Sequence, residues 1–198
     1  PHVFIDNLQN HGFTILIGSF FDSAVTGAYG FILRIIRGPM TIVSGALNQV
    51  VFSKTSNEHD EFKRKKLVLS IIKIGFTLSL FLIPVMFYLP EIFEFIFGKG
   101  WGEAAKYGQV LIPYFYISAI ANTLSSIPIV VKEQKKSFGF SVAGSIIRFL
   151  GLGIAIYVIN FYVGLLFIGI FHSLLLLFGL FWILKISNKK NSDIWLKF

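Results

Sequence analysis

The sequence predicts an all-α membrane protein, built as a polytopic bundle of six membrane-spanning helices. Of its 198 residues, 55% are hydrophobic and only 14% are charged, whereas soluble domains have about 45–50% apolar and about 25% charged residues. Several apolar runs reach the roughly 20 residues that a helix needs to cross a bilayer, and they lack the period-two alternation of strands. The absence of cysteine excludes disulfides and thiolate metal sites.

Five apolar runs are plain, and they cover residues 28–53, 67–89, 107–131, 138–159 and 161–184. A sixth expected span, residues 3–21, precedes these runs, so that 28–53 is the second span and 138–159 the fifth in chain order. This first span is apolar only in its second half. Its first half carries Asp6 and His11, so it is either cut short at the start of the chain or faces an aqueous cavity. The chain begins with a proline instead of methionine, and we interpret it as part of a longer protein.

Three prolines, Pro84, Pro113 and Pro128, fall inside expected spans and predict kinks there. The segment Glu91–Lys106 mixes aromatic and aliphatic side chains with acidic ones. It is expected to be an amphipathic element at the outer membrane surface.

The chain has a net charge of +8, and the position of its basic residues along the sequence shows what this charge indicates. Most of them gather in alternate loops and in the tail: Lys54, Lys63, Arg64, Lys65, Lys66, Lys132, Lys135, Lys136, Lys185, Lys189, Lys190 and Lys197. Because positive loops stay on the cytoplasmic side, we expect an inner-membrane protein with both ends of the chain in the cytoplasm. The charge thus sets orientation, and we expect membrane lipids and no nucleic acid as partners.

The second expected span carries a polar stripe at steps of three and four residues, which includes Arg34, Arg37, Thr41 and Asn48. An arginine at mid-span costs about 3 kcal/mol on insertion scales. Its forked donors match phosphate oxygens. These residues therefore predict an anionic, phosphate-bearing substrate in a central cavity, with snorkelling of Arg34 to the headgroups as the alternative.

A further arginine, Arg148, lies near the middle of the fifth expected span, on one face with Ser141 and Ser145. Snorkelling is difficult from that depth. We expect Arg148 to face the cavity, and a structural ion pair, for instance with Asp6, is the alternative. Lys73 lies closer to the cytoplasmic end, where snorkelling is favoured.

The first helix offers candidates for ion coupling. A histidine and a buried carboxylate can exchange protons near neutral pH, so Asp6 and His11 are the candidate residues. The alternative is that this polar half-helix only lines water. A lone histidine in the last span, His172, is expected to hydrogen bond to a neighbouring helix.

Enzyme signatures are weak throughout the sequence. The run Glu58–Glu61 is better explained as a solvated charge cluster than as a metal site. Gly151 and Gly153 suit helix packing better than a nucleotide loop. We therefore expect no catalytic residues, no metal and no cofactor.

Three segments carry a family resemblance: Gly27–Lys54, Phe97–Pro113 and Ser125–Lys136. Together they resemble the C-terminal half of bacterial polysaccharide flippases of the O-antigen type, in the multidrug, oligosaccharidyl-lipid and polysaccharide exporter superfamily. The resemblance implies a two-lobed transporter, of which residues 1–198 form the C-terminal lobe, with an N-terminal lobe as its partner. It places Arg34 where such proteins often carry a basic residue shortly before a proline, here Pro39. Members commonly have an acidic residue where this chain has Phe13.

The resemblance also implies a function. The expected cargo is an undecaprenyl-diphosphate-linked oligosaccharide, moved outward by alternating access during lipopolysaccharide or other surface polysaccharide synthesis, with other polysaccharide-assembly proteins as further partners. Three alternatives stay open: a related drug or organic-ion exporter, a membrane-bound glycosyltransferase or polymerase, and a non-transporting scaffold.

Overall fold

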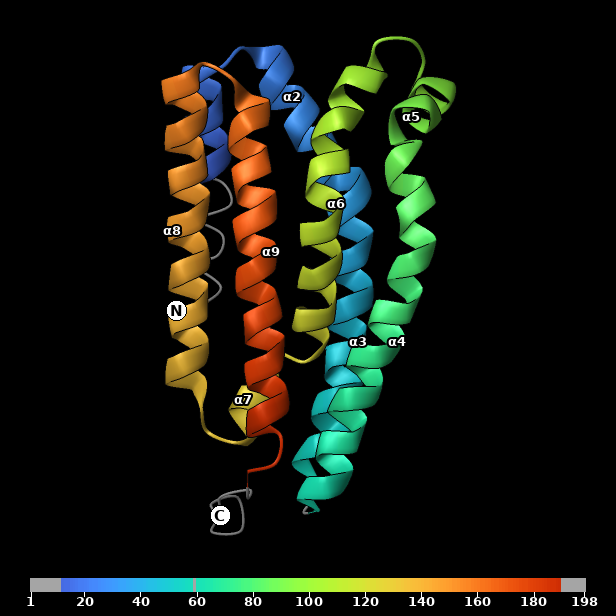
Figure 1. The fold of residues 1–198 in the computed structure, drawn as a ribbon, viewed down its shortest axis with the longest axis vertical. Coiled ribbons are helices and arrows are strands. Elements are labelled where there is room, and N and C mark those ends of the chain that lie inside the picture. The colour runs from blue at the N-terminus through green and yellow to red at the C-terminus, as the bar shows by residue number, and fades with distance from the viewer. Residues whose placement is uncertain (1–11, 59, 190–198) are drawn as a thin grey trace.

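The computed structural model describes residues 12–58 and 60–189, and this part of the chain is helical throughout, apart from short connections. The long helices run roughly side by side in an elongated bundle (Figure 1). After the helical residues 12–20, the elements are α2 (Ser23–Ile32), a π-helical turn (Leu33–Arg37), α3 (Gly38–Ser56), α4 (Glu61–Phe87), α5 (Leu89–Phe97), α6 (Trp101–Thr123), α7 (Ile127–Val130), α8 (Gln134–Val158) and α9 (Phe161–Ile186).

Five segments in the described part of the chain are long and apolar enough to cross a membrane. They are Ser23–Ser56, Glu61–Phe87, Trp101–Val130, Gln134–Val158 and Phe161–Ile186. Each of these five candidate spans includes most of one apolar run predicted from the sequence. The sixth expected span, residues 3–21, lies mostly outside the described residues, of which 12–20 are helical.

Polar caps set several helix starts. The Asp22 carboxylate accepts a hydrogen bond from the Val25 N–H at the start of α2, and Asn160 accepts one from the Tyr162 N–H at the start of α9. Asp60 accepts from the N–H groups of Phe62 and Lys63 in the same way. Such caps satisfy N–H groups that have no partner within the helix. At least one acid of the Glu58–Glu61 cluster therefore has a structural role.

The second expected span contains a break in its helix. The proline at position 39 has no N–H to donate to the carbonyl four residues earlier. The turn before it widens into a π-helical one, in which the Gly38 N–H donates to the carbonyl of Leu33. Because residues advance by a smaller angle in this wider turn, side chains on either side of it no longer follow one α-helical stripe.

At one of the three prolines, Pro128, the structure differs from the kink that was expected. Pro84 and Pro113 lie inside α4 and α6. Pro128 instead lies in the first turn of α7, after α6 has ended at Thr123. A proline is tolerated in the first turn of a helix because its missing N–H would have no partner there, so this span is broken, not bent, at Pro128.

The predicted amphipathic segment consists of α5 and the first turn of α6. The turn between them uses Gly98 and Gly100, both with φ near +100°, a conformation that glycine adopts readily. Aromatic rings close this corner: Phe31 of α2 packs against Phe93 and Trp101 with ring centroids 6.1 and 4.3 Å apart.

The described residues form two core clusters, one towards each end of the bundle. The first includes Phe13, Tyr29 and Phe161, with α6 and α9 side chains around them. The second joins Val51, Val68 and Leu124 with the end of α9. Phe13, where an acidic residue was the family expectation, is 4% exposed and packs on Tyr29, so its role here is packing.

Charge separates between the two ends of the bundle. The basic loops and helix ends around α3, α4, α7 and α9 meet at the lower end in Figure 1, whereas Asp22 and the acidic residues of α5 and early α6 lie at the upper end. The loops therefore alternate between the ends as predicted.

One basic residue at the lower, basic end of the bundle is buried in a helix instead of exposed in a loop. Arg64 is 1% exposed and donates from Nε to the Ser187 carbonyl over 2.8 Å, and from its guanidinium to the Lys189 carbonyl. Lys189 in turn pairs with Glu133, before α8, and this hydrogen bond lowers the pKa of Glu133 and keeps it ionised. The end of α9 is thus attached to both α4 and the α7–α8 connection.

We predict that Gly164→Ala destabilises the α8–α9 contact. A Cβ at position 164 would lie 2.5 Å from the Gly151 carbonyl oxygen and 2.5 Å from Ala155 Cβ. The helices would have to separate, at an expected cost of about 1–3 kcal/mol. Gly153→Ala is the control, because a Cβ there meets nothing within 4 Å. The measurement is the melting temperature of each purified variant, and an equal fall in both variants would contradict the prediction.

We also predict that Arg64→Leu lowers stability by about 1–3 kcal/mol, because the Ser187 and Lys189 carbonyls lose a buried donor. Lys65→Leu, at the exposed neighbouring position, should change stability little. Trypsin cleavage near Lys189 should become faster in Arg64→Leu alone. Equal cleavage rates for the two variants would argue against the attachment of the α9 end by Arg64.

Candidate functional site: a cationic cavity between the helices

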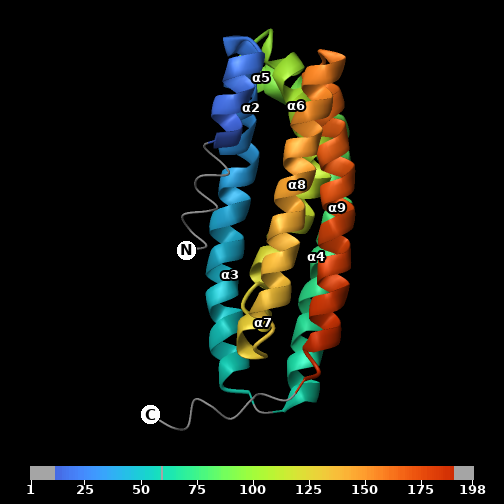
Figure 2. The same cartoon turned by 90° about the vertical axis from the view of Figure 1, so that its left-hand side faces the viewer.

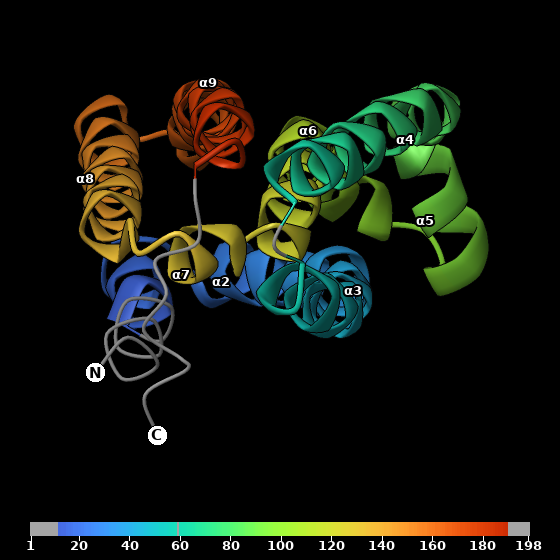
Figure 3. The ribbon, with the colours of Figure 1, turned by 90° about the horizontal axis from the view of Figure 1, so that it is seen from below.

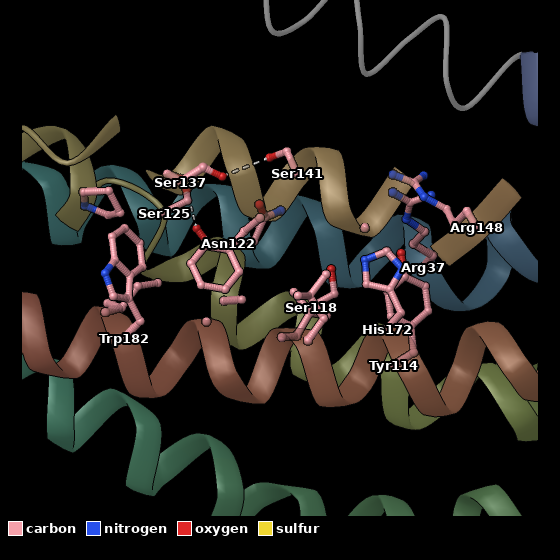
Figure 4. A pocket seen from close by; sticks show the side chains of 18 residues that line it. Arg37, Tyr114, Ser118, Asn122, Ser125, Ser137, Ser141, Arg148, His172 and Trp182 are labelled. Carbon is pink, nitrogen blue, oxygen red and sulfur yellow. Dashed lines mark hydrogen bonds between the residues drawn. The ribbon is translucent and has the colours of Figure 1, made fainter. Parts of the chain in front are cut away.

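A cavity of about 350 Å³ lies between α6, α8 and α9, with the end of the π-helical turn at one side. Figure 4 shows its length, from Arg37 and Arg148 to Ser125 and Ser137. Figure 2 and Figure 3 show that α3 and the α8–α9 pair flank this region, with α7 near its lower end. The lining residues with polar or aromatic side chains are Arg37, Tyr114, Ser118, Asn122, Ser125, Ser137, Phe140, Ser141, Arg148, His172 and Trp182.

Two arginines from different elements meet at one end of this cavity. Arg37 is the last residue of the π-helical turn, and Arg148 lies mid-way along α8. Both are partly buried, and their guanidinium groups point towards the same space (Figure 4). The two positive charges raise each other's energy in surroundings of low dielectric constant, and an anion between them would lower it.

Beyond the arginines the protein is closely packed. A void of about 10 Å³ lies there, lined by the two arginines and by Phe13, Tyr29, Leu111, Tyr114, Phe115, Leu165 and Ile168. A volume of that size holds about one water molecule. The arginines therefore lie between a polar cavity on the side of the basic end and an apolar plug on the side of the acidic end.

The rest of the cavity wall is rich in small polar side chains. Ser118, Asn122 and Ser125 follow one another along α6 and the turn after it, and Ser137 and Ser141 face them from α8. Among the described lining residues none is acidic. Hydroxyl and amide groups can bind the hydroxyls of a sugar, and the positive charge of the two arginines favours an anionic over a cationic ligand.

The structure brings together only part of the residue set predicted from the sequence. Arg34 is exposed and does not line the cavity, although it lies three residues from Arg37. Both residues lie in the π-helical turn, where each residue advances by a smaller angle than in an α-helix, so Arg34 is rotated away from the face that carries Arg37. Thr41 is also outside the lining, and its hydroxyl donates to the Arg37 carbonyl over 2.9 Å.

Asn48 has a different position from the one expected. Its side-chain amide donates to the Thr123 carbonyl and to the hydroxyls of Ser125 and Ser126, over 3.1, 3.1 and 3.3 Å. These bonds join α3 to the break between α6 and α7. Asp6 and His11, the ion-coupling candidates, lie outside the described residues.

Sequence reasoning missed the contribution of α6 and α9. The expected cavity was lined by the first, second and fifth spans, but α6 supplies Tyr114, Ser118 and Asn122, and α9 supplies His172 and Trp182. A signal was present in α6, where Ser118, Asn122 and Ser125 recur at four- and three-residue steps in an apolar helix. His172 was expected to hydrogen bond to a neighbouring helix, but its Nδ1 atom has no hydrogen-bond partner among the described residues.

Comparison with known protein families gives a match over residues 2–106, to the family described as polysaccharide biosynthesis protein. The match covers just over half of the chain. The chain belongs to this family. No curated protein and no solved structure matches it.

For this polysaccharide biosynthesis protein, the matched segment runs through α2, α3, α4 and α5 into the first turns of α6. It includes Arg37, whereas Arg148 and most of the cavity wall follow it. Among residues 12–58 and 60–189, no group of three or more His, Asp or Glu side chains is placed to hold a metal ion. The cavity itself combines two guanidinium groups with a wall rich in hydroxyl groups.

We predict that Asn48→Ala acts on stability. Removal of the amide leaves the Thr123 carbonyl without this donor and frees the α6–α7 break from α3, at an expected cost of about 1–2 kcal/mol. Gln49→Ala, at an exposed position on the same helix, serves as the control. If Asn48→Ala lowers polysaccharide export but leaves the melting temperature unchanged, Asn48 contacts substrate, and the structural role is wrong.

Proposed function

We propose that the protein moves a lipid-linked oligosaccharide, carried on a phosphate or diphosphate such as undecaprenyl diphosphate, across the bacterial inner membrane for surface polysaccharide synthesis. The observation that carries the proposal is the pair Arg37 and Arg148, which come from two helices and face one cavity in the membrane-spanning region. Bidentate guanidinium donors match phosphate oxygens. The family, polysaccharide biosynthesis protein, supports a glycan as the cargo.

The shape of the cavity supports a direction for the transport. If the basic end is cytoplasmic, as positive loops are in membrane proteins, the cavity reaches from the cytoplasmic half to the arginines, and the apolar plug closes the outer half. Both ends of the chain then lie in the cytoplasm. Rocking against a second lobe would open the plug and release the cargo outside, as in transporters with an alternating-access cycle.

The lining argues against the other candidate classes. A carrier of organic cations needs acidic groups towards the ligand, but two arginines face this cavity and none of its described lining residues is acidic. A glycosyltransferase or polymerase needs acidic or histidine side chains that converge near one membrane face. Transfer of sugar from a nucleotide donor by the purified protein would support that class and overturn the transporter proposal.

We predict that Arg37→Ala and Arg148→Ala each lower export of surface polysaccharide about tenfold or more, because each removes a charge-assisted contact to phosphate. Arg→Lys at the same positions should restore part of the export if charge alone matters, and little if the fork is required. The measurement is complementation of a strain that lacks the gene, with protein abundance checked by immunoblot.

Lys73→Ala is the matched control, because Lys73 is a basic residue within a span that is exposed and outside the cavity. It should export at the level of the unmodified protein. Full export by both arginine variants at normal abundance would refute the proposed phosphate site.

A further inference from the structure

His172 is a polar ring in the wall of the cationic cavity. It lies on α9, is 7% exposed, and stacks on Tyr114 of α6 with ring centroids 4.5 Å apart and planes inclined by 34°. Figure 4 places both rings beside Arg37 and Arg148. Three helices and the π-helical turn therefore converge on this end of the cavity.

Packing alone does not account for a histidine at this position. Its Nδ1 is buried and has no hydrogen-bond partner among the described residues. A buried polar atom without a partner costs about 1–3 kcal/mol, and an apolar ring would fill the same space without that cost. Because the His172 ring lines the cavity beside the two arginines, an unpartnered nitrogen in this ring points to a ligand contact.

The neighbouring helix makes room for the imidazole. Gly144 of α8 faces His172 so closely that a Cβ at position 144 would lie 2.8 Å from Nε2 and 3.1 Å from Cε1. With Tyr114 stacked against the ring, the imidazole is held in a narrow slot. Its nitrogens are therefore held at the end of the cavity where the arginines converge.

We propose that His172 is the third anion-binding residue of this site, and that its imidazole N–H donates to an oxygen of the phosphate group bound by Arg37 and Arg148. This inference rests on the proposed function and extends it to selectivity. An imidazole always offers at least one N–H donor. Donors from three elements surround a tetrahedral phosphate, whereas a planar carboxylate presents its oxygens in one plane. His172 thus makes the site selective for phosphate over carboxylate anions.

The test is binding of inorganic pyrophosphate and of oxalate to the purified full-length protein in lipid nanodiscs, by isothermal titration calorimetry. His172→Phe keeps the ring stacked on Tyr114 but removes both nitrogens. His172→Asn loses the ring but keeps an N–H donor close to the Nδ1 position. We expect about tenfold weaker pyrophosphate binding in His172→Phe, with oxalate binding little changed, and binding closer to the unmodified protein in His172→Asn.

The outcomes separate this inference from the proposed function. If Arg37→Ala and Arg148→Ala weaken pyrophosphate binding but His172→Phe binds as the unmodified protein does, only the role of His172 is overturned. Tighter pyrophosphate binding by His172→Phe than by His172→Asn would assign His172 to packing and would also overturn its proposed role. If the unmodified protein binds no pyrophosphate, or the arginine variants bind it equally well, the proposed phosphate site fails and the inference fails with it.

A second pair of variants tests the slot. Gly144→Ala should displace the imidazole and weaken pyrophosphate binding as His172→Phe does, whereas Gly153→Ala on the same helix should have no effect. Because the two changes act on one contact, the double variant Gly144→Ala with His172→Phe should bind pyrophosphate no more weakly than either single variant. Additive losses would contradict the positioning of His172 by Gly144.

Discussion

The cost of two guanidinium groups within the membrane-spanning part of the chain governs how these helices are arranged. Hydrocarbon cannot solvate Arg37 or Arg148, so each must face protein or a polar cavity. The bundle meets this constraint by turning both towards one space and lining that space with serine and asparagine. Many apolar side chains outside the two core clusters face outwards, as on α4, where Leu80 and Phe81 are more than 60% exposed.

Close helix contacts give the cavity its boundaries. On one side, Gly151 and Gly164 let α8 and α9 approach until a Cβ would touch the opposite backbone, and the pair then forms one continuous wall. On the other side, Pro39 imposes the π-helical turn that aims Arg37 inwards. At the basic end, Arg64 and the Lys189–Glu133 pair fix the end of α9 to its neighbours, which holds the cavity wall in place between the two core clusters.

The site and the proposed function are consistent in their chemistry. The forked donors of an arginine match a phosphate group, which carries the opposite charge and has oxygens for several donors. The serines and Asn122 lie farther along the same wall, where hydroxyl-rich cargo would follow a phosphate bound at the arginines. The proposed place of His172 in this arrangement converts a general preference for anions into one for tetrahedral anions.

The sequence by itself determined the class of fold. Apolar runs of spanning length require helices in a membrane, because only a helix satisfies its own backbone there, and the five spans in the described residues follow these runs closely. The alternation of basic and acidic loops was also visible, since it depends only on the order of the chain. Of the site, Arg37 and Arg148 could be found because charge inside an apolar run is conspicuous.

Only the tertiary structure decided which polar residues share a cavity. A stripe on a helical wheel assumes an unbroken α-helix, but Arg34 and Arg37 both lie in a π-helical turn, and only Arg37 lines the cavity. Asn48 was grouped with the site by spacing, but its amide bonds to the α6–α7 break. His172 and Tyr114 have no neighbour in sequence that marks them, since they meet across two helices. Such contacts arise from the packing of helices that are distant in sequence, which local patterns do not encode.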